Sequence, residues 1–458
     1  MVPIPKIVIA GGGIVGNSIA YFLAKRQVPV TLIDPVGIAP CASGKAGGFL
    51  AKDWRDGTPL QELQRAGFEL HQTLAAELSL NDDDDDDHDT GDNSIDYRRL
   101  TCQAVAVDAS SSTSSTSSSS QGGGAVKKPN NRKSKSLEWV DHEGVFGSSS
   151  MGGKQTIAQV HPKKLCQALW KYSESQGSTL KIGKVVKVLT TTTAATTTAT
   201  SAATVDDDHE DHDESLQAIQ LEDGTTIPAD KLIIACGPWT EHARYWFSSK
   251  DLQDYWPTIT GVKCHSVLVQ APKTLSEAVF FERAPFAAKS KEGDAGDDET
   301  GTDRLLTTEQ LSSVEVYPRP DGDAYVNGFE GDEVIITEEP GQEVVEEDAV
   351  QKLELALHQT SSMLQNSIAH TKQVCYWPET PDGLPILDCV QDFLGGDSTY
   401  IAAGHSVWGI LQGPISGKAM SELILDGEAS CVDLTPFQLE RFLYDDNEED
   451  AEEDDEMF

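Results

Sequence analysis

The most regular pattern of apolar and polar positions lies near the start of the chain. Residues 6–10 form an apolar, β-branched run, which is typical of a buried strand in a parallel sheet. Downstream, Ile19, Phe22 and Leu23 recur at helical spacing and predict a helix with one buried stripe. A second apolar run at 28–33 predicts another buried strand. Together these elements predict a βαβ unit.

Similar alternation continues between polar inserts as far as the C-terminal region. The expected elements are a helix over 160–176, a strand over 184–189, a hairpin of 216–222 and 226–227, and a buried strand over 231–235. Period-two alternation at 261–270, 314–318 and 324–329 predicts antiparallel strands, followed by a helix near 343–365. The last elements are a strand that ends at Gly404 and a helix that starts near Pro414, because proline suits a first helical turn.

These elements predict an α/β fold with a parallel-sheet, dinucleotide-binding domain and a second, mostly antiparallel α+β domain. The first domain would consist of residues 1–80, 151–245 and 371–443, and the second of 94–150 and 246–370. Five segments are dominated by Asp, Ser, Gly, Thr or Glu and are expected to be disordered inserts and an acidic tail: 81–93, 109–136, 190–214, 286–312 and 444–458.

Composition narrows the choice of partners and compartment. The 458 residues carry a formal charge of −40, which disfavours nucleic acid and anionic membranes as partners. Eight cysteines occur without a CxxC pair or the Cys/His spacing of a zinc site, so we expect free thiols and no metal. We therefore expect a cytoplasmic protein without a transmembrane segment. Peripheral association with an internal membrane, and a protein partner for the acidic tail, stay open.

Three glycines after the first strand carry the first chemical signal. Gly11, Gly13 and Gly16 have the G-x-G-x-x-G spacing at which backbone approaches a pyrophosphate and a helix N-terminus faces its charge. Asp34 follows 23 positions after Gly11, near the spacing of about 20 expected for an acid that binds a ribose 2′-hydroxyl. The unit therefore predicts a dinucleotide without a 2′-phosphate.

Two further segments distinguish between dinucleotides. The closing strand, turn and helix would direct a helix N-terminus at the ligand site, where it stabilises a reduced flavin; NAD needs no such site. The small residues of Cys41–Gly48 let backbone run against a flat ligand, and Ser43 suits a phosphate. An ordinary crossover and a surface loop are the alternative interpretations.

Taken in order, these motifs resemble the FAD-dependent oxidoreductases that include D-amino-acid oxidase, glycine oxidase and sarcosine oxidase. The resemblance rests on GGGIVGNSIAYFLA with Asp34, ASGKAGG, QVHP around His161, LIIACGPW, TPDGLPILD and AAGHSVWGILQGPISGKAMSELI. It implies a glutathione-reductase-type FAD domain beneath an antiparallel substrate domain, and C–N bond oxidation by hydride transfer to flavin N5, with electrons passing to oxygen or another acceptor. It also implies FAD contacts at Gly11, Gly13, Ile14, Val15, Gly16, Asp34, Ser43, Gly44, Lys45, Ala46, Gly47, Gly48, Val185, Val186, Gly237, Trp239, Gly404, Gly409, Ile410, Leu411 and Gln412.

The substrate residues depart from this family pattern. Two arginines that clamp a substrate carboxylate in glycine-oxidase-like members are replaced here by Trp377 and Val407. Tyr317 and Arg319 are the best substitutes, with Arg283 behind them; a surface partner of nearby acids is an equal interpretation of Arg319. Trp377, Trp408 and His405 would instead form an aromatic wall suited to a bulky or cationic amine, or be packing residues.

Cys375 stands seven residues before Asp382, where sarcosine-oxidase-like members form a thioether to the flavin. A buried, unbonded cysteine is the favoured interpretation. Two other functions stay open: an NAD-dependent dehydrogenase, which explains only the first 34 residues, and a flavin-binding scaffold or trafficking factor with little catalytic activity.

Overall fold

The computed structural model describes residues 4–79, 94–108, 137, 139–141, 145–193, 213–254, 256–275, 277–284, 305–329, 331, 333–390 and 398–442. The predicted inserts 81–93 and 109–136 and the acidic tail 444–458 lie outside these ranges, as does most of 190–214 and 286–312. No helix within the described ranges is both long and apolar enough to cross a bilayer.

The N-terminal βαβ unit forms the centre of a six-stranded sheet. The strand order is β19 (Ile386–Cys389), β20 (Thr399–Ala403), β12 (Lys231–Ile234), β1 (Ile7–Ala10), β2 (Val30–Asp34) and β8 (Thr179–Ile182). All neighbours are parallel except β19, which runs antiparallel to β20. The parallel-sheet prediction is therefore confirmed.

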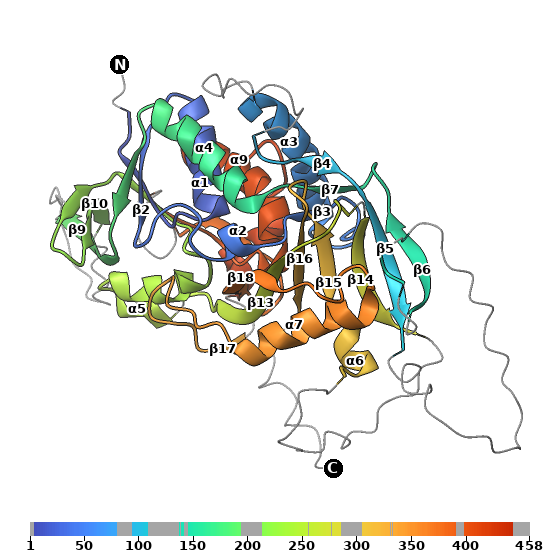
Figure 1. The fold of residues 1–458 in the computed structure, drawn as a ribbon. Coiled ribbons are helices and arrows are strands. Elements are labelled where there is room, and N and C mark those ends of the chain that lie inside the picture. Colours follow the sequence, from blue (N-terminus) through green and yellow to red (C-terminus); the bar gives the residue numbers. More distant parts are fainter. Residues whose placement is uncertain are drawn as a thin grey trace, which may run out of the picture.

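Side chains of β1 alternate between two packing layers. Ile7 and Ile9 pack with four helices on one face: α1 (Ile14–Lys25), α3 (Gln61–Ser79), α4 (Pro162–Ser175) and α9 (Gly409–Asp426). Val8 and Ala10 pack on the other face with a three-stranded sheet of β9 (Val185–Thr193), β10 (Asp213–Leu221) and β11 (Thr226–Pro228). Figure 1 shows α1, α4 and α9 together on one side of β2 and β9 and β10 at its far side.

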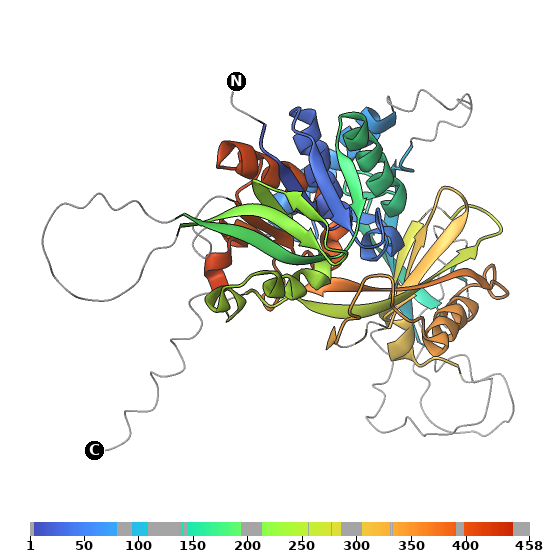
Figure 2. The same ribbon diagram turned by 90° about the vertical axis from the view of Figure 1, so that its left-hand side faces the viewer.

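A second, eight-stranded sheet forms the antiparallel domain. Its path is β17 (Glu333–Val334), β13 (Thr260–Gln270), β16 (Asp323–Gly328), β15 (Glu315–Pro318), β14 (Glu277–Arg283), β5 (Thr101–Val107) and β6 (Val145–Gly152), and β18 (Ala369–Glu379) pairs with β13. Only the β14–β5 pair is parallel. In Figure 2 its yellow and orange segments lie to one side of the blue and red ones.

One face of this sheet is covered by helices and the other faces the first domain. Val316, Val326 and Phe281 pack with α7 (Glu347–Thr360) and α6 (Thr308–Leu311). The alternate residues Tyr317 and Tyr325 lie on the opposite face. Alternate residues of these strands therefore point to two faces of the sheet, one covered by helices and one facing the first domain.

Shorter elements connect the two large sheets. They are α2 (Ala42–Lys45), α5 (Lys250–Asp254), a small sheet of β3 (Phe49–Ala51), β4 (Arg98–Arg99) and β7 (Ile157–Gln159), and the 3-10 helices η2 (Gly237–Trp246), η3 (Ser406–Trp408), η4 (Thr435–Phe437) and η5 (Leu439–Phe442).

Several predicted boundaries are corrected by the pairing of strands. The predicted domain boundary at residue 371 lies inside β18, which pairs with β13 along its length. Both ends of the predicted insert 190–214 lie in strands, because β9 extends to Thr193 and β10 begins at Asp213. Helix α6 lies within the predicted insert 286–312.

The start of the last helix is also corrected. Helix α9 begins at Gly409, and Pro414 lies inside it. Proline lacks the N–H that would bond to the carbonyl of Ile410. Nε2 of the buried His71 lies 2.9 Å from that carbonyl oxygen and replaces the missing donor. A side chain of α3 therefore supplies the hydrogen-bond donor that Pro414 removes from α9.

Candidate functional site

A cavity of about 400 Å³ lies between the two large sheets. It begins at the carboxyl ends of β1, β2, β12 and β20, where ligands of open α/β sheets bind, and extends to the antiparallel sheet. Its walls include Gly11–Val15, Asp34, Gly237–Trp239 and Gly404–Ile410 from the first domain, and Phe280, Tyr317 and Tyr325 from the second.

The glycine motif is required by close packing at the start of α1. Gly11 has φ +113°, and a Cβ there would lie 2.2 Å from the carbonyl oxygen of Ala235. A Cβ at Gly16 would lie 2.0 Å from the carbonyl oxygen of Gly11. Gly16 does not line the cavity; it allows the approach of helix to strand. Gly13 is the N-cap of α1 and supplies no side-chain cap, so the helix N-terminus faces the cavity.

Asp34 lies in the cavity wall at the end of β2 and is 6% exposed. Its carboxylate accepts backbone hydrogen bonds of 2.8 Å from Gly12, Val36 and Gly37. Burial raises the pKa of this carboxyl, and these three hydrogen bonds act against that rise. The acid thus ties the glycine turn to the second strand and presents a carboxylate at the position predicted to meet a ribose.

The segment 41–48 divides into cavity-lining and supporting residues. Ser43, Ala46, Gly47 and Gly48 line the cavity, and Ser43 Oγ accepts a 2.9 Å hydrogen bond from the N–H of Ile14. Gly44 and Lys45 do not line it. Lys45 Nζ donates to the carbonyl of Val374 at 2.9 Å and pairs with Glu343 at 3.3 Å. The lysine therefore anchors α2 to β18.

Most of the remaining predicted cofactor residues reach the cavity. Val185, Gly237, Trp239, Cys375, Gly404, Gly409 and Ile410 line it, and Val186, Leu411 and Gln412 do not. Gln412 Nε2 instead donates to Gln64 Oε1 at 2.9 Å, which joins α9 to α3. The α9 N-cap, Trp408, makes no side-chain cap, so this second helix N-terminus also opens towards the cavity.

The face of the antiparallel sheet contributes a cluster of aromatic rings. Phe49 stacks on Tyr317 with 5.1 Å between ring centroids, and Tyr317 stacks on Tyr325 at 5.8 Å. Phe280 and Trp54 pack against Phe49 at 5.3 and 5.2 Å. We call these five side chains the aromatic cluster.

The predicted aromatic wall is only partly included in this cluster. Trp408 touches it edge-on through Trp54 at 6.4 Å. Trp377 and His405 line the cavity, but the ring contacts found among the described residues do not join them to the cluster. His405 Nε2 lies 2.9 Å from Ser416 Oγ, and burial lowers the pKa of this histidine to about 4.

Arg319 is not placed to clamp a substrate. It is 6% exposed and lies behind Tyr325, with its guanidinium carbon 5.6 Å from the ring centroid, and it does not line the cavity. Its NH2 group donates to the carbonyl of Ala46 at 3.3 Å, and NH1 lies 3.4 Å from His161 Nε2. The surface interpretation is wrong as well, because the side chain is buried. Arg283 also lies outside the cavity wall.

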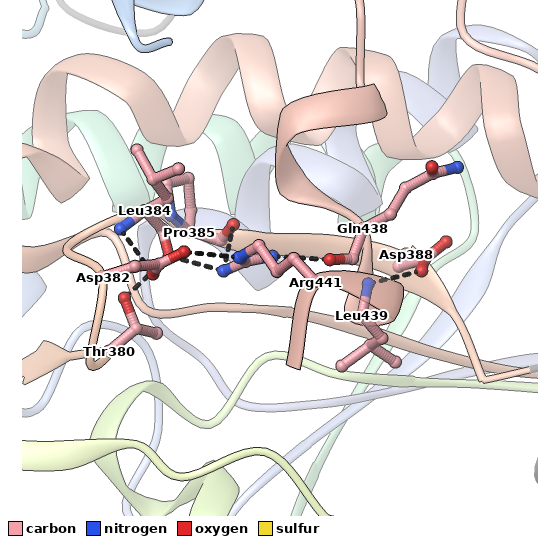
Figure 3. Close-up of polar contacts among 8 residues, drawn as sticks. All are labelled: Thr380, Asp382, Leu384, Pro385, Asp388, Gln438, Leu439 and Arg441. Atoms are coloured by element: carbon pink, nitrogen blue, oxygen red, sulfur yellow. Dashed lines mark hydrogen bonds and ion pairs between the residues drawn. The ribbon is translucent and has the colours of Figure 1, made fainter. Parts of the chain in front are cut away.

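The TPDG motif is held in place by the last described residues of the chain. Arg441 Nε donates to Asp382 Oδ2 at 2.6 Å, and its NH2 group donates to the carbonyl of Leu384 at 2.9 Å. Leu439 N–H donates to Asp388 Oδ2 at 2.8 Å. Figure 3 shows Arg441 reaching from η5 to this turn. The TPDG motif is thus a turn that hydrogen bonds from η5 hold in place.

Sequence patterns did not identify several side chains at the antiparallel-sheet end of the cavity wall, among them Trp54, Phe280, Glu315, Tyr325 and Asn327. Glu315 and Asn327 lie two positions from Tyr317 and Tyr325 on their own strands, so the period-two pattern placed each pair on one face. The pattern did not say which face meets the cavity.

The donor set fits the predicted FAD. The close-packed glycines, the N-terminus of α1 and the Asp34 carboxylate would suit the ADP part, and the N-terminus of α9 would suit the flavin edge. No group of three or more metal-ligating side chains occurs within the part of the chain that is described.

Comparison with known proteins supports this assignment. The family model described as FAD dependent oxidoreductase matches residues 6–423. A Schizosaccharomyces pombe protein named as an oxidoreductase is 27% identical, with 94% of this chain and 96% of that protein covered. A Saccharomyces cerevisiae protein with the same description is 27% identical, with 94% and 93% covered.

Solved structures share the fold. Glycine oxidase from Geobacillus kaustophilus is 19% identical, with a TM-score of 0.64 and coverage of 95% of this chain and 98% of that one. Iminodiacetate oxidase from Chelativorans sp. BNC1 is 18% identical, with a TM-score of 0.62 and coverage of 94% and 98%. Because the family model spans most of the chain, this protein belongs to the FAD-dependent oxidoreductases.

Proposed function

We propose that this protein oxidises a C–N bond of an amine or amino-acid-like substrate. The observation that carries the proposal is one continuous cavity that joins the glycine motif and Asp34 to the aromatic cluster. When bound, FAD would supply the hydride acceptor, and oxygen or another acceptor would receive the electrons. The solved relatives named for glycine and iminodiacetate oxidation support a C–N substrate.

In this proposal the chain's own residues bind and orient the substrate. The aromatic cluster would exclude water and offer flat faces against which a substrate could be oriented. Gly47 brings the cofactor segment against the cluster, because a Cβ there would lie 2.2 Å from Tyr317 Cδ2. Trp408 from the first domain and Trp377 from β18 of the antiparallel sheet complete the wall.

We also propose a cytoplasmic location and a protein partner for the acidic tail. All eight cysteines are free thiols, which supports a reducing compartment. The concentration of carboxylates in 444–458 favours a basic partner.

The test is anaerobic reduction of the bound flavin. Purified holoprotein would be mixed with primary amines, N-methyl amino acids, glycine and D-alanine, and its visible absorption recorded, with free FAD as the control. We expect bleaching by at least one amine and none by glycine or D-alanine. If no compound bleaches the flavin, the scaffold function is favoured. Rapid bleaching by glycine would contradict the inference that this site does not bind a small amino-acid carboxylate.

A further inference from the structure

We propose that the substrate end of the cavity is a binding site for an organic ammonium ion, with Glu315 as the residue that selects positive charge. This inference rests on the proposed function, since it names the substrate class of that site. The site is formed by side chains on three adjacent strands, β14, β15 and β16.

Strand register places the polar and aromatic residues in two rows. Glu315 lies opposite Asn327 across the β15–β16 pair, and Tyr317 lies opposite Tyr325. Phe280 lies opposite Glu315 on the other side, across β14–β15. All five line the cavity. The sheet therefore presents one carboxylate and one amide beside the aromatic cluster.

Two neutral groups orient this carboxylate. The hydroxyl of Tyr317 donates to Glu315 Oε2, and Asn327 Nδ2 donates to the same oxygen at 3.3 Å. A carboxylate accepts but does not donate, so the amide nitrogen must face Glu315. Asn327 Oδ1 is then directed away, is buried and has no hydrogen-bond partner. An N–H donor of a ligand bound beside Glu315 would pair with the carboxylate through a charge-assisted hydrogen bond.

The surrounding rings favour the same charge. Phe49, Phe280 and Tyr317 lie within 5.1 to 5.7 Å of one another by ring centroid. The faces of aromatic rings carry negative charge and attract a cation, most strongly when water is excluded. Burial, and next the charge of Glu315, raise the pKa of Tyr317, so this hydroxyl stays protonated as a donor.

Few cationic side chains lie in the described part of the cavity wall. Of the described residues in the cavity wall, Lys184 is the one lysine and none is arginine. Lys184 adjoins Val185 and pairs with Glu339 at 3.0 Å and Glu338 at 3.4 Å. Arg319 is separated from the cavity by Tyr325. A substrate carboxylate beside Glu315 would therefore meet repulsion without a guanidinium partner.

The test compares two ligands of similar shape and opposite charge. Benzamidinium is a cation with N–H donors and has no C–H bond on the carbon that bears nitrogen, so it cannot be oxidised in the proposed way. Benzoate is its anionic counterpart. Each would be titrated into oxidised holoprotein, and binding followed by the change in flavin absorption and by calorimetry. We expect benzamidinium to bind and benzoate to bind at least tenfold more weakly.

Variants identify the residue responsible. Glu315→Gln should weaken benzamidinium binding about ten- to hundredfold, the range for a charge-assisted hydrogen bond. Glu315→Asp should retain part of the affinity because it keeps the charge. Glu282→Gln removes the same charge at an exposed position of the same sheet outside the cavity wall and should change nothing. FAD content of each variant shows that the fold is kept.

The outcomes separate this inference from the proposed function. Equal or tighter binding of benzoate, or unchanged benzamidinium binding in Glu315→Gln, would overturn the ammonium site even if an amine reduces the flavin. Binding of benzamidinium that depends on Glu315, in a protein whose flavin no amine reduces, would support the ammonium site and count against the oxidase function.

Discussion

Cys375 lies in the cavity wall, opposite Cys264 on the neighbouring strand. Burial raises the pKa of the Cys375 thiol to about 12, so the thiolate that would attack a flavin ring is scarce at neutral pH. We expect noncovalent FAD. After acid precipitation of the protein, all yellow colour should appear in the supernatant, for wild type and Cys375→Ala alike. Colour retained in the wild-type pellet and released by Cys375→Ala would establish a thioether instead.

Gly11 and Gly16 are positions where the backbone itself makes the contact. Gly11 and Gly16 are required because a Cβ atom at these positions would lie 2.2 and 2.0 Å from neighbouring carbonyl oxygens, and their sequence spacing alone identified them. Arg319 shows the opposite case. Its type suggested a carboxylate ligand, but the ring of Tyr325 separates it from the cavity. A side chain's chemistry does not say which way it faces.

At the scale of elements, the C-terminal 3-10 helix η5 supports the site from a distance. Arg441 bonds Asp382 and the carbonyl of Leu384, and the turn so held contacts Gly404, where a Cβ would lie 2.6 Å from Thr380 Cγ2. Gly404 lines the cavity. Arg441 of η5 therefore fixes the turn that packs against this part of the cavity wall.

Arg441→Ala should therefore weaken both stability and cofactor retention. We expect the free energy of unfolding to fall by about 1.5 to 3 kcal/mol, the range for hydrogen bonds to charged groups, and FAD to dissociate more readily. Thermal unfolding and recovery of flavin fluorescence would measure the two effects. Arg441→Lys, which keeps the charge without the planar fork, should lie between. Unchanged FAD retention in Arg441→Ala would show that the turn held by Arg441 does not influence cofactor binding.

For the whole molecule, buried histidines set how stability depends on pH. Burial lowers the pKa of both His71 and His405 to about 4, from an ordinary value of 6.5. Between these two pH values each of these histidines binds more protons in the unfolded chain than in the folded one, so its contribution to stability is lost as the pH falls from 6.5 towards 4. Each histidine contributes at most about 1.4 kcal/mol per pH unit within this window.

Urea unfolding from pH 5 to 7.5 with excess FAD would measure this slope. His71→Gln should reduce it, because glutamine does not titrate and its amide N–H is still a donor for the carbonyl of Ile410. An identical slope in His71→Gln would mean that His71 is not a source of the pH dependence.

The sequence by itself determined the local features: the βαβ unit, the glycine turn, Asp34 and the alternation of β15 and β16, because period and backbone sterics act over a few neighbouring residues. The motif order was also sufficient to identify the FAD family. The tertiary structure alone decided which strand face meets the cavity, that Arg319 lies behind Tyr325, and that Glu315 pairs with Asn327. These depend on strand register and on contacts between distant segments, which a local pattern does not encode.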